Sequence, residues 1–237
     1  MLTKTAQGAA NNTDPMFIAG DLVPHGVAIG LWMLLLPVCA FAWRLADWHA
    51  LLSVPARQHL VFGAILFCLV LWLLSVRVID GLWLHFLGMT SVTLLLGARF
   101  ALLAGTAALV LLALLLGESW RGLSPAWLLT VAIPVAVSRL LVHALRKLRS
   151  RNLFIYLLGA GFGGGLLSVL AVATAALPLL WIIGQEDWTR SALENWPLIA
   201  LMLFPEGFIN GMLVTTLTVF HPQIMKTFDD RHYLDGD

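Results

Sequence analysis

The sequence predicts an all-α, polytopic membrane protein built as a bundle of about seven transmembrane helices. Hydrophobic residues make up 60% of the 237 residues and charged residues only 11%, and the mean hydropathy is +0.90. This apolar content is far above that of soluble globular chains. A membrane-crossing helix needs about 20 predominantly apolar residues, because lipid cannot satisfy backbone N–H and C=O groups. Several stretches meet this requirement, which excludes a soluble role.

Seven charge-poor windows are the candidate spans. The third is short and meets the fourth at 97–99, so the pair forms either a helical hairpin or a partly re-entrant segment. The sixth would be roughly 48 Å long as one helix, beyond a hydrocarbon core of about 30 Å, so it must tilt, break near Pro178 or project from the membrane. The windows are Gly26–Trp43, Leu60–Val76, Leu82–Ala98, Phe100–Gly117, Ala126–Leu145, Leu153–Gly184 and Pro197–Phe220.

The basic residues between the windows predict the orientation, because cytoplasmic loops retain Lys and Arg. The run Arg146–Arg151 is the strongest signal for a cytoplasmic loop. With seven spans the N-terminus is then outside and the C-terminus cytoplasmic, and ten of the 14 Lys and Arg fall inside. We expect a flexible polar tail over residues 1–15, a single transmembrane helical domain over 16–222 and a cytoplasmic tail over 223–237.

Three polar or sulfur-bearing residues of the last window form a candidate intramembrane polar site. Glu206 lies about ten residues into that window, where a charge costs roughly 2.5–3.5 kcal/mol. Met202, Glu206 and Asn210 follow each other at intervals of four and share one helix face. A thioether, a carboxylate and an amide on one stripe are suited to line an ion site. The alternative is that Glu206 pairs with a buried Arg, or is protonated, and ties helices together.

His85 and Met89, in the third window, are the candidate metal ligands that the residues themselves suggest. Imidazole binds nickel, cobalt, zinc or copper, and a thioether suits Cu(I). The alternative for a single histidine in a membrane helix is an ordinary hydrogen bond to a neighbouring helix. The pairs Gly159/Gly163 and Gly161/Gly165 predict close helix contact rather than phosphate binding. No nucleotide or hydrolase signature is present in the sequence, so we expect neither an enzyme nor a covalently bound cofactor.

Several motifs resemble a known family over most of residues 16–234. Leu84-His-Phe-Leu-Gly88, followed by a glycine-ended helix at Leu94–Gly97, is similar to a His-Leu-Leu-Gly motif, and Pro205–Thr215 is similar to a Glu-Gly…Thr pattern in a last helix. These motifs belong to the CbiM/NikM family, the cobalt/nickel-uptake membrane components of energy-coupling-factor transporters. Asn152–Tyr156 and Thr227–Leu234 resemble an uncharacterised bacterial membrane-protein branch of it.

The resemblance also implies a set of metal ligands, of which this chain keeps one. Metal-importing members begin Met-His-Ile, and the terminal amine and that histidine bind the ion together with the histidine of the His-Leu-Leu-Gly motif. Here Met16-Phe17-Ile18 occupies the place, so Phe17 replaces one ligand and the preceding residues displace the amine. His85 carries over from the motif. His25, at the outer mouth of the first window, is the candidate substitute.

The resemblance therefore implies two functions. The first is a substrate-binding permease subunit for transition-metal uptake across the bacterial inner membrane, energised by separate ATPase and coupling subunits. Nickel or cobalt is the family's cargo, and the methionines leave copper open. The second is a non-transporting accessory or assembly subunit of a larger membrane complex, with a decayed metal site, which Phe17 favours. Partners are membrane lipids and membrane proteins in both cases, and no nucleic acid.

Overall fold

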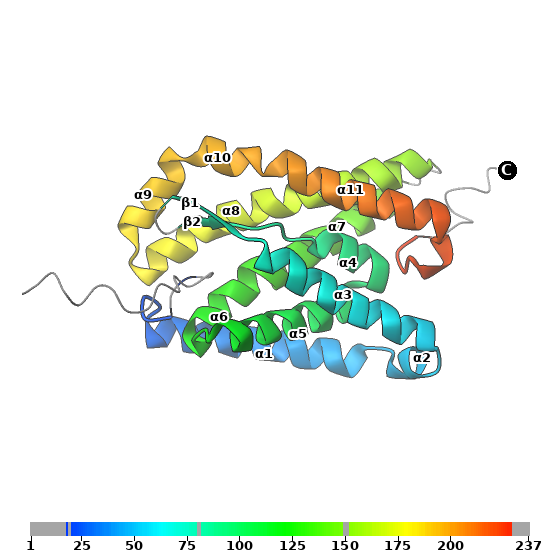
Figure 1. The fold of residues 1–237 in the computed structure, drawn as a ribbon, viewed down its shortest axis with the longest axis horizontal. Coiled ribbons are helices and arrows are strands. Elements are labelled where there is room, and N and C mark those ends of the chain that lie inside the picture. Colours follow the sequence, from blue (N-terminus) through cyan, green and yellow to red (C-terminus); the bar gives the residue numbers. More distant parts are fainter. Residues whose placement is uncertain (1–17, 19, 80–81, 149–151, 229–237) are drawn as a thin grey trace, which may run out of the picture.

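The computed structural model describes residues 18, 20–79, 82–148 and 152–228. Helices dominate this part of the chain, and six are long and apolar enough to cross a membrane. They run roughly along the long axis of the molecule (Figure 1), which confirms the prediction of an all-α polytopic membrane protein. The six are α1 (His25–Leu45), α3 (Pro55–Leu73), α5 (Ala98–Leu116), the unit α6–η1–α7 (Trp120–Lys147), the unit η2–α8 (Ile155–Ile183) and α11 (Leu203–Phe220).

Two of these units contain π-helical turns, and shorter elements connect the rest. The two π-helical segments are η1 (Leu128–Ala132), between α6 (Trp120–Trp127) and α7 (Ile133–Lys147), and η2 (Ile155–Gly163), before α8 (Gly164–Ile183). The connecting elements are α2 (Trp48–Leu52), β1 (Val76–Ile79), β2 (Leu82–Leu84), α4 (Met89–Leu96), α9 (Glu186–Glu194), α10 (Trp196–Leu201) and η3 (Pro222–Ile224).

The unit η2–α8 answers the question raised by the overlong sixth window. Its 29 residues give about 44 Å of helix, longer than a hydrocarbon core of about 30 Å. The helix does not break near Pro178, because α8 continues past it and ends at Gly184, whose φ is 85°. The irregular backbone is η2, at the other end of the unit. Tilting or projection remain as the ways to fit this length to a bilayer.

The third window, Leu82–Ala98, is not a membrane-length helix. Residues 82–84 form β2, which pairs antiparallel with β1, and the helix that follows, α4, has only eight residues, or about 12 Å. Gly88 and Gly97 bound α4 with positive φ values of 66° and 79°, which L-residues rarely adopt. The predicted seventh helical span is therefore not confirmed, and the re-entrant alternative describes this segment better. Hydropathy predicted a membrane span here because the segment is apolar. Its side chains are apolar because they are buried in protein, and not because they face lipid.

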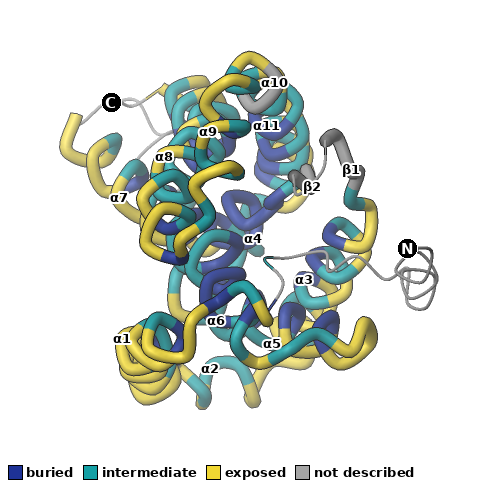
Figure 2. The backbone as a smooth tube through the Cα atoms, turned by 90° about the vertical axis from the view of Figure 1, so that its left-hand side faces the viewer, coloured by how far each residue is buried: buried dark blue, intermediate teal, exposed yellow. Residues whose placement is uncertain are grey.

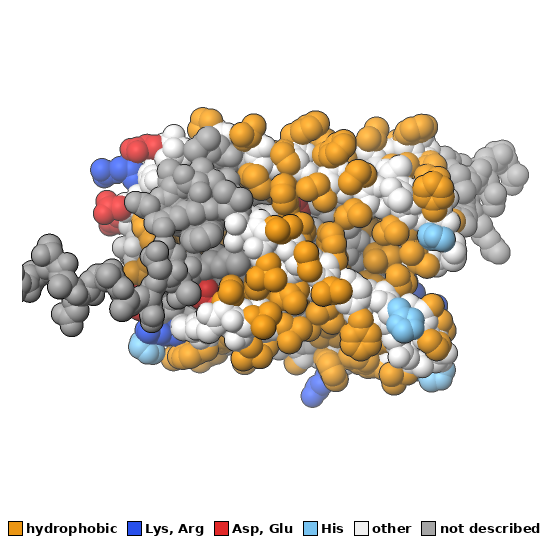
Figure 3. All heavy atoms as spheres, in the orientation of Figure 1, with side chains coloured by type: hydrophobic (Ala, Val, Ile, Leu, Met, Phe, Trp, Pro, Cys, Tyr) orange, Lys and Arg blue, Asp and Glu red, His pale blue; other side chains and the backbone are white. Residues whose placement is uncertain are grey.

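Burial confirms that α4 lies inside the bundle and that the other helices surround it. Met89 to Leu94 are all buried, and α4 occupies the middle of the molecule when it is viewed along its length (Figure 2). The outer helices instead expose large apolar side chains such as Phe62, Leu114 and Phe220, each about 70% exposed. Figure 3 shows hydrophobic side chains covering the middle of the viewed face. Such a surface requires lipid, because water would penalise it.

Apart from α4, the connections between the long helices lie at the two ends of the bundle (Figure 1). At one end, the indole of Trp32 donates to the Trp120 carbonyl at 3.1 Å; at the other, the Arg99 guanidinium donates to the Leu45 carbonyl at 2.7 Å. The beginning (blue) and the end (red) of the described chain lie at opposite ends of the molecule (Figure 1). Four basic residues, Arg99, Arg139, Arg146 and Lys226, lie around one pocket at the second end. The assignment of this end to the cytoplasm remains a prediction.

Residues after α11 return to the bundle instead of leaving it at once. The backbone N–H groups of Lys226 and Thr227 donate to the carbonyls of Leu95 and Leu94 at 3.0 and 3.2 Å. Met225 is 3% exposed and packs in a cluster with Leu94. The first part of the predicted 223–237 tail is thus packed against α4. The predicted tail over residues 1–15 lies outside the described residues.

Candidate functional site

Glu206 of α11 is the most buried carboxylate of the described chain, and it binds the beginning of α4. Only 1% of the residue is exposed. Its two carboxylate oxygens accept backbone N–H groups: Oε2 from Leu87 and Oε1 from Gly88, both at 2.8 Å. These are N–H groups at a helix N-terminus, which carry a partial positive charge and otherwise lack partners. The described partners of Glu206 are these main-chain groups and the side-chain amide of Asn210, and no arginine of the described residues is among them.

Asn210, one turn further along α11, continues this interaction along the first turn of α4. Its Oδ1 accepts the Ser91 N–H at 2.8 Å and the Ser91 hydroxyl at 2.7 Å. Its amide nitrogen donates to the Glu206 carbonyl at 2.8 Å and to Glu206 Oε1 at 2.7 Å. The predicted common face of Glu206 and Asn210 is thus present. It acts as a side-chain cap for a helix that has no cap of its own, since Gly88 stands at the cap position.

Met202 does not belong to this cluster of hydrogen bonds. It lies at the cap position of α11, its carbonyl accepts the Glu206 N–H at 3.1 Å, and its residue is only half-buried. With three hydrogen bonds from protein groups, the carboxylate of Glu206 has most of its acceptor capacity in use. This geometry supports a role in holding helices together over a role in lining an ion path.

Close glycine packing brings α11 against the η2–α8 unit, as the pair Gly161/Gly165 predicts, whereas Gly159 of the other pair lies against Leu145 of α7. A Cβ on Gly165 would lie 2.9 Å from the Glu206 carbonyl oxygen, and one on Gly161 would lie 3.1 Å from Val214. The facing surface of α11 has its own pair of this kind, Gly207 and Gly211, both against Phe162. Their G-x-x-x-G spacing is a second sequence signal for close helix contact.

A cluster of three buried hydroxyl groups lies behind α4, and sequence reasoning missed it. The Ser138 hydroxyl donates to Thr90 Oγ1 at 3.0 Å, and Thr90 Oγ1 is 3.1 Å from Ser168 Oγ. All three residues are at most 1% exposed. They come from α4, α7 and α8, so no local spacing in the sequence indicates that they meet. Together with Glu206 and Asn210 they tie three helices, α7, α8 and α11, to the N-terminal half of α4.

His85 lies in the non-helical stretch between β2 and α4, two residues before the backbone groups that Glu206 binds. The residue is half-buried, and its Nδ1 is 3.2 Å from the Phe86 carbonyl oxygen. The Leu87 carbonyl accepts the indole N–H of Trp72 at 3.0 Å, so α3 and α11 both fix this stretch. An imidazole in this position is the type of ligand that nickel and cobalt accept.

The other two candidate ligands do not join His85 in a described contact. The Met89 thioether faces α3 and α5, where it accepts from the Cys68 thiol at 3.7 Å and lies against Gly105. His25 is exposed at the start of α1, with its ring 6.4 Å from that of Trp120. Among the residues that the structure describes, no three of His, Cys, Asp and Glu come close enough to hold a metal ion. Phe17 lies outside the described residues.

The fold and these contacts define a multi-pass membrane protein whose interior polar groups bind a short internal helix. The comparison with known families assigns it further: residues 18–224 match the family described as the cobalt uptake substrate-specific transmembrane region, CbiM. The chain belongs to this family, a family of transporter components and not of enzymes. No curated protein and no solved structure matches it significantly.

Proposed function

We propose that this chain is the substrate-binding membrane subunit for uptake of a transition-metal ion of the nickel or cobalt type. In this proposal it is a multi-pass protein of the bacterial inner membrane, with the N-terminus outside and the C-terminus in the cytoplasm. The chain has no nucleotide-binding motif in its sequence, so energy comes from separate ATPase and coupling subunits. Membership of the cobalt-uptake family supports the substrate class.

The observation that carries the proposal is the anchoring of the His85 backbone. Two residues after His85, the chain is bound by Glu206 through Leu87 and Gly88, at 2.8 Å each, and by Trp72 through the Leu87 carbonyl. A metal ligand has to be held in place before the metal arrives, because ordering it on binding would cost affinity. Glu206 and Asn210 then act as positioning residues, and His85 touches the ion.

We propose His25 and Met89 as further ligands, of which Met89 would have to change its side-chain orientation to reach the ion. His25 is the first residue of α1. In the proposed orientation it lies on the side from which an external ion arrives. The Met89 thioether has to turn away from Cys68 to reach an ion at His85, and it would favour Cu(I) over nickel or cobalt. Binding of nickel or cobalt thus points to nitrogen ligands and binding of copper to the sulfur of Met89.

The decisive experiment measures the metal content of the purified protein. Wild type and His85→Ala are purified after growth with nickel, cobalt or copper, and bound metal is counted by mass spectrometry of the elements. We expect metal to be bound by the wild type and lost in His85→Ala. His59→Ala is the matched control, because His59 is an exposed histidine of α3. A metal-free wild type after metal-replete growth, or full retention by His85→Ala, overturns the proposal.

The second candidate function is a non-transporting accessory subunit of a larger membrane complex. One observation favours it: Phe17 stands where metal-importing members have a histidine, and no three-residue metal group is found in the part that the structure describes. Purification of the native complex separates the two functions. An ATPase and a coupling protein that remain bound support uptake, whereas other membrane subunits without an ATPase support the accessory function.

A further inference from the structure

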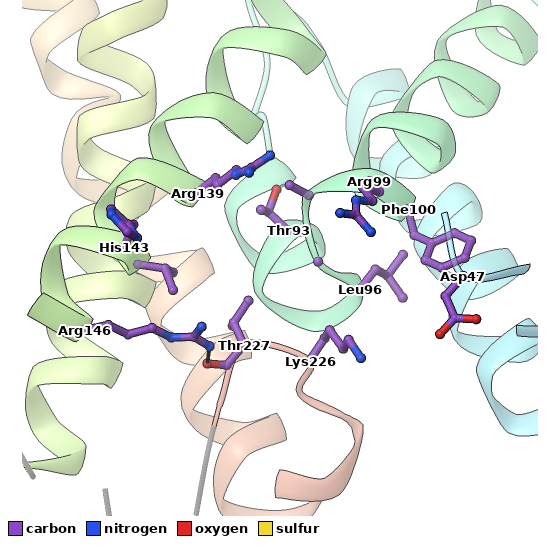
Figure 4. Close-up of a pocket in the computed structure, with 13 residues that line it drawn as sticks. Asp47, Thr93, Leu96, Arg99, Phe100, Arg139, His143, Arg146, Lys226 and Thr227 are labelled. Atoms are coloured by element: carbon purple, nitrogen blue, oxygen red, sulfur yellow. Dashed lines mark hydrogen bonds between the residues drawn. The ribbon is translucent and has the colours of Figure 1, made fainter. Parts of the chain in front are cut away.

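A cationic pocket lies at the opposite end of α4 from the Glu206 cluster. It has a volume of about 340 Å³ and lies between the C-terminal end of α4, the start of α5, the second half of α7 and the residues after η3. Its lining includes four cations, Arg99, Arg139, Arg146 and Lys226, against a single carboxylate, Asp47. In Figure 4 the side chains of Arg99 and Arg139 approach the pocket from opposite walls and point toward one another.

The single carboxylate does not neutralise these cations. Asp47 caps α2, since its Oδ1 accepts the Ala50 N–H at 3.0 Å. Within the described residues, the guanidinium of Arg139 and the ammonium of Lys226 form no hydrogen bond or ion pair. Like charges that face one another raise the energy of the empty pocket, so an anion that enters it is attracted by all four.

Two of the cations are held in position by main-chain carbonyl groups. The Arg99 guanidinium donates to the Leu45 carbonyl at 2.7 Å, and that of Arg146 donates to the Thr227 carbonyl at 2.8 Å, the dashed line of Figure 4. Each guanidinium has five N–H donors, so each keeps donors for a further acceptor. Planar guanidinium groups that are already oriented suit the paired oxygens of a phosphate.

The cations are not required to cap α4. The Thr93 carbonyl accepts the Gly97 N–H at 2.9 Å, and the Leu95 carbonyl accepts the Lys226 N–H at 3.0 Å. The Leu94 carbonyl accepts both the N–H and the hydroxyl of Thr227. Backbone and hydroxyl groups therefore satisfy the last turn of α4. The guanidinium of Arg139 and the ammonium of Lys226 are therefore not needed to cap this end of the helix.

The pocket continues into a surface that faces lipid. Arg139 and His143 are exposed on α7, and the adjacent Leu140 is 67% exposed. Leu148, at the end of the same helix, is 68% exposed. The cations thus lie where an apolar, lipid-covered face gives way to the basic end of the bundle, which is the level of lipid headgroups. Basic pockets between membrane helices at this level bind anionic headgroups.

We propose that this pocket binds a phosphate group, which a headgroup of an anionic phospholipid or a free phosphate ion supplies. The bound phosphate bridges Arg139 of α7 to Arg99 of α5 and to Lys226, and so fastens the C-terminal end of α4 to its neighbours. This site lies at the other end of α4 from His85 and is independent of metal binding. Neutralisation of one cation costs about fivefold in affinity, since each contributes about 1 kcal/mol near an anionic surface.

The test measures the thermal stability of the purified full-length protein with two probes. Phosphatidylglycerol is added to one arm and inorganic phosphate to the other, each against a matched addition of phosphatidylcholine or sodium chloride. A rise of the melting temperature with phosphatidylglycerol alone identifies a lipid headgroup, and a rise with inorganic phosphate identifies a free ion. Variants Arg139→Gln and Lys226→Gln should need about fivefold more probe for the same rise.

Arg44→Gln is the matched control, because Arg44 lies exposed at the same end of the bundle but does not line the pocket. If Arg44→Gln weakens the response as much as Arg139→Gln does, the effect is one of general surface charge and the proposal is overturned. It is also overturned if neither probe stabilises the wild type, and an acidic segment of a partner protein then becomes the occupant to seek. Lys226→Gln keeps the test valid if Arg139→Gln does not fold.

Discussion

The two ends of α4 are held by opposite means. At its N-terminal end, side chains of α11 bind backbone N–H groups, and both Glu206 and Asn210 are at most 1% exposed. At its C-terminal end, backbone groups after η3 bind its carbonyls, and the charged side chains of that region stand around an open pocket. An eight-residue helix has too few residues to be stable alone, so both attachments are needed.

The N-terminal end of α4 holds a neighbouring segment in position, whereas the C-terminal end has charged groups that remain accessible to a ligand. The N-terminal end has its polar groups paired inside the bundle, where an unpaired group costs most, so this end fixes the stretch that carries His85. At the C-terminal end, Arg139 and Lys226 form no side-chain hydrogen bond or ion pair among the described residues, so this end has capacity to bind something else. Variants at the N-terminal end of α4 should therefore lower the stability of the protein more than variants at its C-terminal end.

The largest effect is expected for Glu206→Leu. This change leaves the N–H groups of Leu87 and Gly88 without an acceptor in a low-dielectric interior, each at about 1–3 kcal/mol, so the loss in unfolding free energy is about 2–6 kcal/mol. Titration with a denaturing detergent measures it. Glu194→Leu, an exposed glutamate of α9, is the matched control and should change stability little. A Glu206→Leu protein as stable as that control would show that the N-terminal end of α4 needs no anchor.

Asn210→Leu should cost less, about 1–3 kcal/mol, because one buried N–H, that of Ser91, loses its acceptor. Asn210→Asp sharpens this prediction. It keeps the acceptor for Ser91 but places a second carboxylate where the amide nitrogen donates to Glu206 Oε1 at 2.7 Å. The melting temperature should therefore fall for Asn210→Asp as well. If only Asn210→Leu is destabilised, the bond between the two α11 side chains contributes nothing.

Gly88→Ala tests the backbone that the two side chains hold. Its φ of 66° costs a residue with a Cβ about 1–2 kcal/mol, and that Cβ would lie 2.5 Å from the Leu71 side chain. Gly63→Ala is the matched control, because nothing lies within 4 Å of its added Cβ and alanine favours a helix by about 1 kcal/mol. Thermal melting should thus shift in opposite directions. An unchanged melting temperature for Gly88→Ala would mean that the backbone before α4 adapts to the added Cβ. That backbone would then not hold His85 in a fixed position.

The sequence predicted the fold wherever a helix faces lipid, and failed at α4. Hydropathy located the long helices because their exposed surfaces must be apolar. The third window was apolar too, but its side chains pack on protein, and an average over a window does not distinguish the two surroundings. The local signals were Gly88 and Gly97, which end α4 on both sides.

The sequence predicted which residues of α11 form the candidate site, but not the groups that they bind. The spacing of Glu206 and Asn210 placed them on one face, because helix periodicity is a local property. Their partners were not predictable, since backbone N–H groups occur at every residue and only the three-dimensional arrangement selects those of Leu87, Gly88 and Ser91. The Thr90–Ser138–Ser168 cluster joins three distant segments, and a single hydroxyl residue in a membrane helix carries no signal of its partner.

The smallest effect is expected at the C-terminal end, for Thr227→Val. The Thr227 hydroxyl donates to the Leu94 carbonyl at 2.9 Å and is 2.8 Å from the Tyr156 hydroxyl. Its loss should cost only about 0.5–1.5 kcal/mol, because the Leu94 carbonyl keeps the Thr227 N–H and the end is partly open.

A double-mutant cycle with Tyr156→Phe isolates the contact between the two hydroxyls, and the coupling energy should not exceed about 1 kcal/mol. A loss for Thr227→Val equal to that for Asn210→Leu would abolish the contrast between the two ends. The open end of α4 would then be as firmly fixed as the buried one, and a phosphate would not be needed to fasten it.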